Sequence, residues 1–191
     1  MSNIRLFFSA ALSTDMIDKL DKSQSHYLNK VMRVKENEVF SLFNCNGEWE
    51  AKVLSISKSI IKFKTIKQIR QKENIKELWL AFSPIKSNYQ NFMIQKATEL
   101  GVTKFLPIIF DRTIVRKINK ERLEKIVIEA SEQSNRINVP IIETAQDLNC
   151  FLKKNSMDLI FETLQLLAHL YDLTAHSLQL QFFLNVFYLF F

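Results

Sequence analysis

Hydrophobic and polar positions alternate through most of the first third of the chain. A period of two is typical of strands that bury one face and leave the other in solvent. It predicts strands at residues 4–8, 39–44, 48–57 and 61–65. Gln24–Arg33 lacks the alternation and is predicted to be a short helix or turn segment. The first third is therefore expected to be a small β-rich domain with barrel-like patterning.

The strongest local signal in this domain is a hairpin. Cys45, Asn46 and Gly47 separate two of the predicted strands, and Asn-Gly is favoured in tight hairpins because both residues accept a positive φ. In the strand that follows, the alternation predicts buried positions at Trp49, Ala51 and Val53 and solvent-facing positions at Glu48, Glu50 and Lys52.

The pattern changes after a polar stretch at residues 68–76, which is predicted to be a linker. A strand at 77–82, a helix at 88–100 and a strand at 105–110 predict a parallel βαβ unit with a right-handed crossover. Gly101 stands where a glycine often ends a helix. Residues three and four apart predict a buried helix face made of Tyr89, Phe92, Met93, Lys96, Ala97 and Leu100.

The same alternation of helix and strand continues along the chain. A helix at 120–134 is predicted to bury Leu123, Ile126, Val127 and Ala130. A strand at 139–143, a helix at 147–153 and a strand at 157–161 are predicted to follow. The fold class is α/β.

Composition and charge narrow the function classes. The chain is 47% hydrophobic and 24% charged, as in a globular protein, and its net charge of +6 suits a polyanionic partner. Cys45 and Cys150 predict neither a disulfide framework nor a zinc site, and a reducing cytoplasm fits this cysteine usage. With Gly47 and Gly101 as its only glycines, the chain has no Walker loop and no dinucleotide-binding fingerprint.

The charge is distributed unevenly along the chain. No Lys or Arg follows Lys154, and Asp172 is the ionised residue expected between Thr163 and Phe191. The apolar run 182–191 is shorter than the roughly 20 residues of a membrane span. No membrane anchor is therefore expected.

Four short segments resemble one known family. Gln95–Val102 reads Gln-Lys-Ala-Thr-Glu-Leu-Gly-Val, and Glu129–Arg136 reads Glu-Ala-Ser-Glu-Gln-Ser-Asn-Arg. Together with His26–Leu28 and Val31–Arg33, they resemble the ribosomal RNA small subunit methyltransferase E family, over residues 4–161. Members methylate N3 of a uridine in 16S rRNA with S-adenosylmethionine.

The resemblance implies a fold and partners. It implies a PUA-like β-barrel that binds RNA at residues 1–68, followed at 77–161 by the first part of a SPOUT-type, trefoil-knotted α/β methyltransferase domain. The implied partners are 16S rRNA in the small ribosomal subunit and a second copy of the chain. Residues 162–191 do not resemble the family, so a homodimer is not expected here.

The resemblance assigns catalytic or substrate-contacting roles to four residues: Arg112, Glu129, Gln133 and Arg136. Arg112 follows a predicted strand, where a guanidinium can polarise a uracil carbonyl or hold a phosphate. The other three, at i, i+4 and i+7, form a polar stripe that by residue type alone is equally a solvated helix face. Asn135 departs from the family, which prefers glycine there.

An RNA-binding role is assigned to five further residues: His26, Arg33, Lys62, Lys64 and Lys86. Lys30 and Lys35 extend the set of basic residues. By residue type alone, these positions are also compatible with purely structural roles. A single His is commonly structural, Lys86 is also a typical solvated loop residue, and lysines at 62 and 64 also protect edge strands from aggregation.

The family's donor loops, Gly-Pro-Glu-Gly-Gly and Leu-Gly-x-Arg-Ile-Leu-Arg, do not occur in this chain. We therefore expect no cofactor-binding residues and no S-adenosylmethionine binding. The tail from Glu162 resembles A+T-rich DNA translated out of frame, which suggests a truncated or frameshifted family member. Two alternatives stay open: a non-catalytic RNA-binding remnant, and an α/β protein with a membrane- or partner-binding tail.

Overall fold

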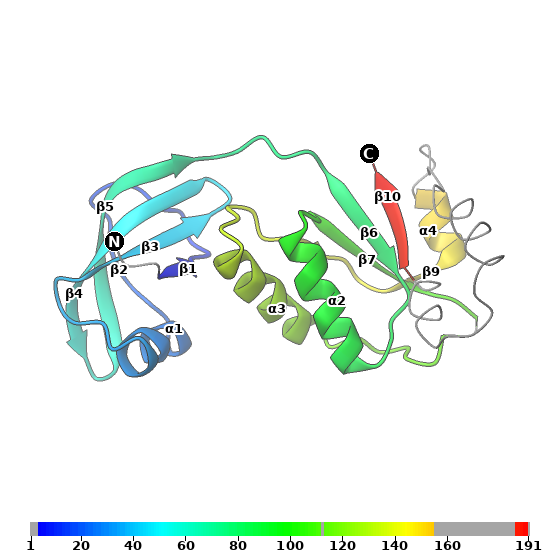
Figure 1. Ribbon diagram of the computed structural model, residues 1–191, viewed down its shortest axis with the longest axis horizontal. Helices are drawn as coiled ribbons and strands as arrows, with labels where there is room; N and C mark the ends of the chain where they lie inside the picture. The colour runs from blue at the N-terminus through cyan, green and yellow to red at the C-terminus, as the bar shows by residue number, and fades with distance from the viewer. Residues whose placement is uncertain (1–3, 112, 155–185, 191) are drawn as a thin grey trace, which may run out of the picture. The chain divides into compact units, whose positions relative to one another are not determined.

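The computed structural model describes residues 4–111, 113–154 and 186–190 (Figure 1). The chain divides into two compact units, each described by itself. Unit 1 contains residues 1–74 and 131–139, and unit 2 contains residues 75–130 and 140–191. Unit 1 thus includes a short segment from late in the chain, which the strand pattern of its first part does not predict.

Unit 1 is built around one sheet with the strand order β1-β3-β4-β5-β2. Its β1 strand runs parallel to β3, and the other pairs are antiparallel. A short helix, α1, continues into a π-helical turn, η1, in the stretch that the sequence predicts to be a helix or turn. The bounds are Arg5–Phe7 (β1), Ile17–Lys19 (β2), Lys22–His26 (α1), Tyr27–Val31 (η1), Val39–Asn44 (β3), Gly47–Ser57 (β4) and Ile60–Gln71 (β5).

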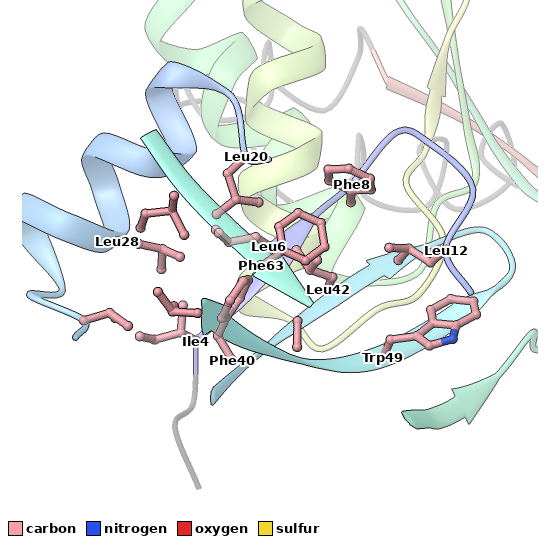
Figure 2. Close-up of a cluster of buried hydrophobic side chains, with 14 residues drawn as sticks. Ile4, Leu6, Phe8, Leu12, Leu20, Leu28, Phe40, Leu42, Trp49 and Phe63 are labelled. Atoms are coloured by element: carbon pink, nitrogen blue, oxygen red, sulfur yellow. The ribbon is translucent and has the colours of Figure 1, made fainter. Parts of the chain in front are cut away.

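The core of unit 1 lies against the inner face of this sheet (Figure 2). Phe63 meets Phe8 and Phe40 edge to face, with ring centroids 5.3 and 6.2 Å apart. Leu28 of η1 is fully buried in the same cluster. The predicted inner face of β4 is confirmed, because Trp49, Ala51 and Val53 are all buried.

The β3–β4 hairpin is confirmed, and its loop is Cys45-Asn46, because Asn44 pairs with Gly47. Gly47 has a φ of 140°, which an L-residue rarely adopts. A Cβ at this position would collide with the carbonyl oxygen of Arg70 on β5. Glycine is therefore required by the backbone angle and by the close approach of the next strand.

Two predictions about β5 are wrong. The stretch 68–76 is not all linker, because β5 continues to Gln71 and pairs Arg70 with Glu48 and Gln68 with Trp49. Nor do Lys62 and Lys64 lie on an edge strand, because β5 lies between β4 and β2. Edge protection therefore does not explain these two lysines.

Unit 2 contains a sheet with the order β10-β6-β7-β8, and β9 pairs with the far part of β7. The β6, β7 and β8 strands are parallel, and α2 connects β6 to β7 as the predicted βαβ unit. Figure 1 shows α2 and α3 on one side of this sheet and α4 on the other. The bounds are Leu78–Phe82 (β6), Ser87–Glu99 (α2), Lys104–Ile109 (β7), Lys120–Gln133 (α3), Ile141–Ile142 (β8), Gln146–Asp147 (β9), Leu148–Lys154 (α4) and Val186–Phe190 (β10).

Parts of the predicted pattern after residue 139 differ from the structure. The strand predicted at 139–143 is reduced to Ile141–Ile142, and the strand predicted at 157–161 lies outside the described residues. Residues 186–190, which belong to the tail, form β10 and pair antiparallel with β6. The sheet therefore gains a strand that the sequence pattern does not predict.

The prediction for the buried face of α2 is partly wrong. Tyr89, Phe92 and Leu100 are 59%, 58% and 78% exposed, and Gln90 and Thr98 are buried instead. The two buried polar side chains are satisfied locally, because Gln90 Oε1 accepts from Ile85 N at 3.1 Å and Thr98 Oγ1 donates to Ile94 O at 2.8 Å. The helix is therefore rotated relative to the face that its apolar residues predict.

The predicted glycine end of α2 is confirmed. Gly101, with a φ of 109°, donates its N–H to Thr98 O at 3.1 Å, and Val102 N donates to Ala97 O at 3.0 Å. These two bonds form a Schellman motif, which satisfies carbonyls that have no partner within the helix.

Replacing each glycine by alanine separates the effect of a positive φ from the effect of a close approach. We expect Gly101→Ala to cost about 1–3 kcal/mol from the strained φ alone, since no heavy atom lies within 4 Å of the added Cβ. Gly47→Ala should cost more, because the Cβ also collides with β5. Urea unfolding followed by Trp49 in unit 1 and Trp79 in unit 2 measures both losses. Equal losses would show that the β5 contact contributes nothing.

Candidate functional site

The C-terminal end of α3 carries two of the residues that the sequence assigns to chemistry, Gln133 and Arg136. The helix ends at Gln133, and Asn135 follows with a φ of 60°. Arg136 N then donates to Ser131 O at 3.2 Å, the longer bond of a Schellman motif. Asn135 thus adopts the left-handed conformation that glycine adopts most easily. Asparagine tolerates this conformation better than most residues, so it can stand where the family prefers glycine.

The predicted polar stripe of Glu129, Gln133 and Arg136 is partly wrong, because the helix ends before Arg136. Glu129 and Gln133 are both exposed and stand one turn apart on α3, as predicted. Arg136 lies beyond the helix, so the i+7 spacing does not place it on the same face. Its Nε donates to Asn138 Oδ1 at 3.2 Å, and burial lowers the pKa of the Arg136 guanidinium.

A buried ion cluster holds this helix end within unit 1. Glu48 is 3% exposed, although the alternation of β4 predicts it in solvent. Arg5 donates to both of its carboxylate oxygens, at 2.9 and 3.1 Å, and Arg70 Nη1 lies 3.3 Å from Oε2. A carboxylate is stable in such a place only with charged hydrogen-bonding partners, and two guanidinium groups supply them.

The same two arginines bind the backbone that follows α3. Arg5 donates to the carbonyl oxygens of Ser131, Glu132 and Arg136 at 3.2, 3.1 and 3.0 Å. Arg70 Nη1 donates to Asn135 O at 2.9 Å. The last carbonyls of a helix have no partner within it. Here Arg5 from β1 bonds two of them, Ser131 O and Glu132 O, and Arg70 from β5 bonds the turn that follows the helix.

Glu132 adds a contact in which α3 supplies the side chain and β1 supplies the backbone. Its Oε1 accepts a hydrogen bond from the backbone N–H of Phe7 at 2.9 Å. Arg5 also stands over the Phe43 ring, 4.3 Å from its centroid, so its alkyl and guanidinium groups are packed as well as bonded. Sequence reasoning did not identify Arg5, Glu48 or Arg70. The only signal was a charged residue inside two of the predicted strands, Arg5 and Glu48, whereas Arg70 lies in the stretch that was predicted to be a linker.

The basic residues of unit 1 fall into two groups by their contacts. Lys62 and His26 are exposed. Lys64 is half-buried and its Nζ lies 2.7 Å from Asp15 Oδ1. Arg33 is exposed and has a φ of 54°, a strained angle for a residue with a Cβ. Lys64 is the member of the set whose charge is already paired.

In unit 2, the carboxyl ends of β6 and β7 are joined by a side-chain contact. Ser83 Oγ and Thr113 Oγ1 are 3.0 Å apart, and Thr113 Oγ1 also accepts from Phe110 N at 2.9 Å. Lys86 is exposed at the start of α2, close in sequence to this contact. Arg112, the neighbour of Thr113, lies outside the described residues. Open α/β sheets bind ligands at this edge.

The described part of the chain contains neither a metal site nor a membrane span. No group of three or more His, Cys, Asp or Glu side chains is placed to hold a metal ion within it. No helix in the same residues is long and apolar enough to cross a membrane.

Comparison with known proteins identifies related domains in both units. An RNA methyltransferase PUA domain matches residues 20–66, and an RNA methyltransferase domain matches residues 71–180. The ribosomal RNA small subunit methyltransferase E of Rickettsia conorii is 36% identical over 154 residues, which cover 80% of this chain and 63% of that protein. The protein of the same name from Buchnera aphidicola of Acyrthosiphon pisum is 31% identical over 159 residues, covering 79% and 63%. The chain thus spans just under two thirds of the length of these relatives.

Solved structures show the same fold. A ribosomal RNA small subunit methyltransferase E from Neisseria gonorrhoeae, bound to S-adenosyl methionine, superposes with a TM-score of 0.71 at 29% identity, covering 79% of this chain and 65% of that one. A putative methyltransferase from Legionella pneumophila gives 0.74 at 24% identity, covering 83% and 69%. At that identity the second match supports the fold alone. The chain is therefore an α/β protein with an N-terminal PUA-like domain and an RNA methyltransferase domain.

The buried cluster predicts a large difference between two glutamates that both contact Arg70. Glu48→Gln leaves two guanidinium groups without their buried counter-charge and should cost about 3–5 kcal/mol of unfolding free energy. Glu73→Gln is the control, because Glu73 lies 2.6 Å from Arg70 but its side chain is 48% exposed. It should cost about 1 kcal/mol or less. Urea unfolding followed at Trp49 measures both, and similar small losses would mean that the cluster does not stabilise unit 1.

Proposed function

Because the chain belongs to the ribosomal RNA small subunit methyltransferase E family, we propose that it binds 16S rRNA of the small ribosomal subunit through unit 1, in the cytoplasm. The observation that carries the proposal is the exposed set of basic residues on a PUA-like domain, chiefly Arg33 and Lys62. Phosphate neutralisation by Lys and Arg supplies most of the sequence-independent affinity for RNA.

The local charge balance of this surface supports RNA as the partner. No Asp or Glu occurs between Lys22 and Lys35 in the sequence. The carboxylates on either side are turned to backbone N–H groups: Asp21 Oδ1 accepts from Gln24 N at 2.8 Å, and Glu38 Oε2 accepts from Lys35 N at 3.1 Å. The lysines and the arginine of this stretch therefore have no acidic residue between them in the sequence.

The α3 end is proposed to contact the target nucleotide. Methylation of uracil at N3 removes the N3 proton and requires the base to be held in line with the donor, so positioning supplies much of the catalysis. Gln133 offers an amide donor and acceptor, and Arg136 offers a rigid guanidinium fork that can bond a uracil carbonyl or a phosphate. Glu129, one turn before Gln133, and Arg112 remain predicted members of the same set.

We infer that the described residues do not form the site of the methyl donor. Glycine is the residue that most easily lets backbone approach a ligand closely, and the chain has two. Gly47 lies beside β5 in the sheet of unit 1. Gly101 precedes β7 and so lies at the amino ends of the parallel strands of unit 2. Ligands of such sheets bind at the carboxyl ends. We therefore propose an RNA-binding family member whose described residues do not form the family's knotted donor site.

The RNA proposal predicts a salt-dependent affinity that specific residues control. Binding of a 16S rRNA fragment should weaken steeply with salt, because Lys and Arg displace counterions from the phosphates. Replacing Arg33, Lys62 and Lys64 by Ala should flatten the plot of log K against log salt by about one for each phosphate that is no longer neutralised. Filter binding over a salt series measures both slopes.

Two lysines of unit 2 supply the control. Lys153→Ala with Lys154→Ala removes charge from α4 and should leave the slope unchanged. If the two sets of substitutions flatten the slope equally, the affinity reflects net charge and unit 1 is not the RNA-binding surface.

The donor proposal predicts that the purified chain does not bind S-adenosylmethionine. Isothermal calorimetry at protein concentrations suited to micromolar affinities should detect no heat of binding. The enzyme from Neisseria gonorrhoeae, whose structure holds this cofactor, is the positive control. A micromolar dissociation constant for this chain would contradict the proposal.

A further inference from the structure

Three apolar side chains on one short segment of unit 1 are exposed. Tyr27, Val31 and Met32 are 40%, 61% and 42% exposed, whereas Leu28 and Val34 in the same stretch are 0% and 5% exposed and belong to the core. Core packing therefore explains only Leu28 and Val34 in this segment. It does not explain Tyr27, Val31 and Met32, which we call the η1 patch.

The π-helical turn places these three residues next to one another. Met32 N donates to Tyr27 O at 2.9 Å, the i to i+5 bond that defines such a turn. With this wider turn, the residues four and five positions after Tyr27, Val31 and Met32, lie next to it along the helix surface. Leu28, the residue after Tyr27, packs in the core cluster (Figure 2). Single π-helical turns are rare and occur frequently at functional sites.

The η1 patch is surrounded by positive charge. Lys30, Arg33 and Lys35 lie within or just after it, and all three are exposed. Of the nearest carboxylates on the C-terminal side, Glu36 Oε1 accepts from Ile56 N at 3.1 Å and Glu38 Oε2 accepts from Lys35 N at 3.1 Å. An apolar surface with one aromatic ring, bordered by exposed cations, matches a partner that is flat and apolar at its centre and anionic at its margins.

We propose that the η1 patch binds a single unpaired RNA base, stacked on Tyr27, while Lys30 and Arg33 contact the phosphates on either side of it. This inference rests on the proposed RNA binding by unit 1 and assigns its preferred target, a bulged or single-stranded nucleotide. A base in a duplex has both faces covered by its neighbours, whereas an unpaired base can exchange solvent for an aromatic side chain. Flanking phosphates supply the charge complementarity.

Two RNA hairpins that differ by one bulged nucleotide test the inference. The bulge carries a fluorescent aminopurine, and the full chain is titrated with each hairpin. We expect about tenfold tighter binding to the bulged hairpin, the effect of one stacked base, with quenching of the aminopurine. Tyr27→Ala and, separately, Val31→Ser should remove this preference and leave affinity for the unbulged hairpin unchanged. Tyr27→Phe should retain it.

Tyr89→Ala is the matched control, because Tyr89 is an exposed tyrosine on α2 in unit 2 and its replacement should change neither affinity. Equal affinity for the two hairpins, unaffected by Tyr27→Ala, would overturn the η1 inference while leaving the proposed RNA binding intact. Failure to bind either hairpin would overturn both. If Tyr27→Ala instead alters the sedimentation of the chain without RNA, the patch is a protein contact and the inference is wrong.

Discussion

Unit 1 depends on a single buried carboxylate. Glu48 in the middle of the sheet would be strongly destabilising alone, because removing an isolated charge from water costs several kcal/mol. Arg5 from β1 and Arg70 from the end of β5 compensate for it, and their remaining N–H groups bond the carbonyls at the end of α3. One carboxylate therefore fixes two arginines, and the arginines fix residues 131–136.

This arrangement explains why a late segment of the chain belongs to the first unit. The carbonyls exposed where a helix ends need donors, and guanidinium groups can supply several at once in a fixed geometry. Asn135 in the left-handed conformation turns the chain sharply, so that Arg136 leaves the helix but stays bonded to it. Arg136, which we propose to contact the uridine, is thus held by contacts of its backbone, whereas Glu129 and Gln133 keep the spacing of one helical turn.

RNA contact and donor binding make different structural demands. RNA contact needs exposed cations and an apolar surface, and unit 1 presents both on the segment that includes η1. Backbone that approaches a ligand closely favours glycine. Gly47 lies beside β5 in the sheet of unit 1, and Gly101 ends α2. The exposed cations and the apolar surface are the features of unit 1 that support our RNA-binding proposal.

The sequence by itself determined the elements of this protein wherever a single local rule was decisive. Alternation predicted β3 and the inner face of β4, and Asn46-Gly47 and Gly101 marked a hairpin and a helix end, because these signals depend on neighbouring residues only. The family motifs further indicated the two domains. Local pattern misplaced Glu48 in solvent and Tyr89, Phe92 and Leu100 in the core. Only tertiary structure decided those positions, since a charge can be buried when distant arginines meet it, and a helix rotates to the face whose neighbours fit best.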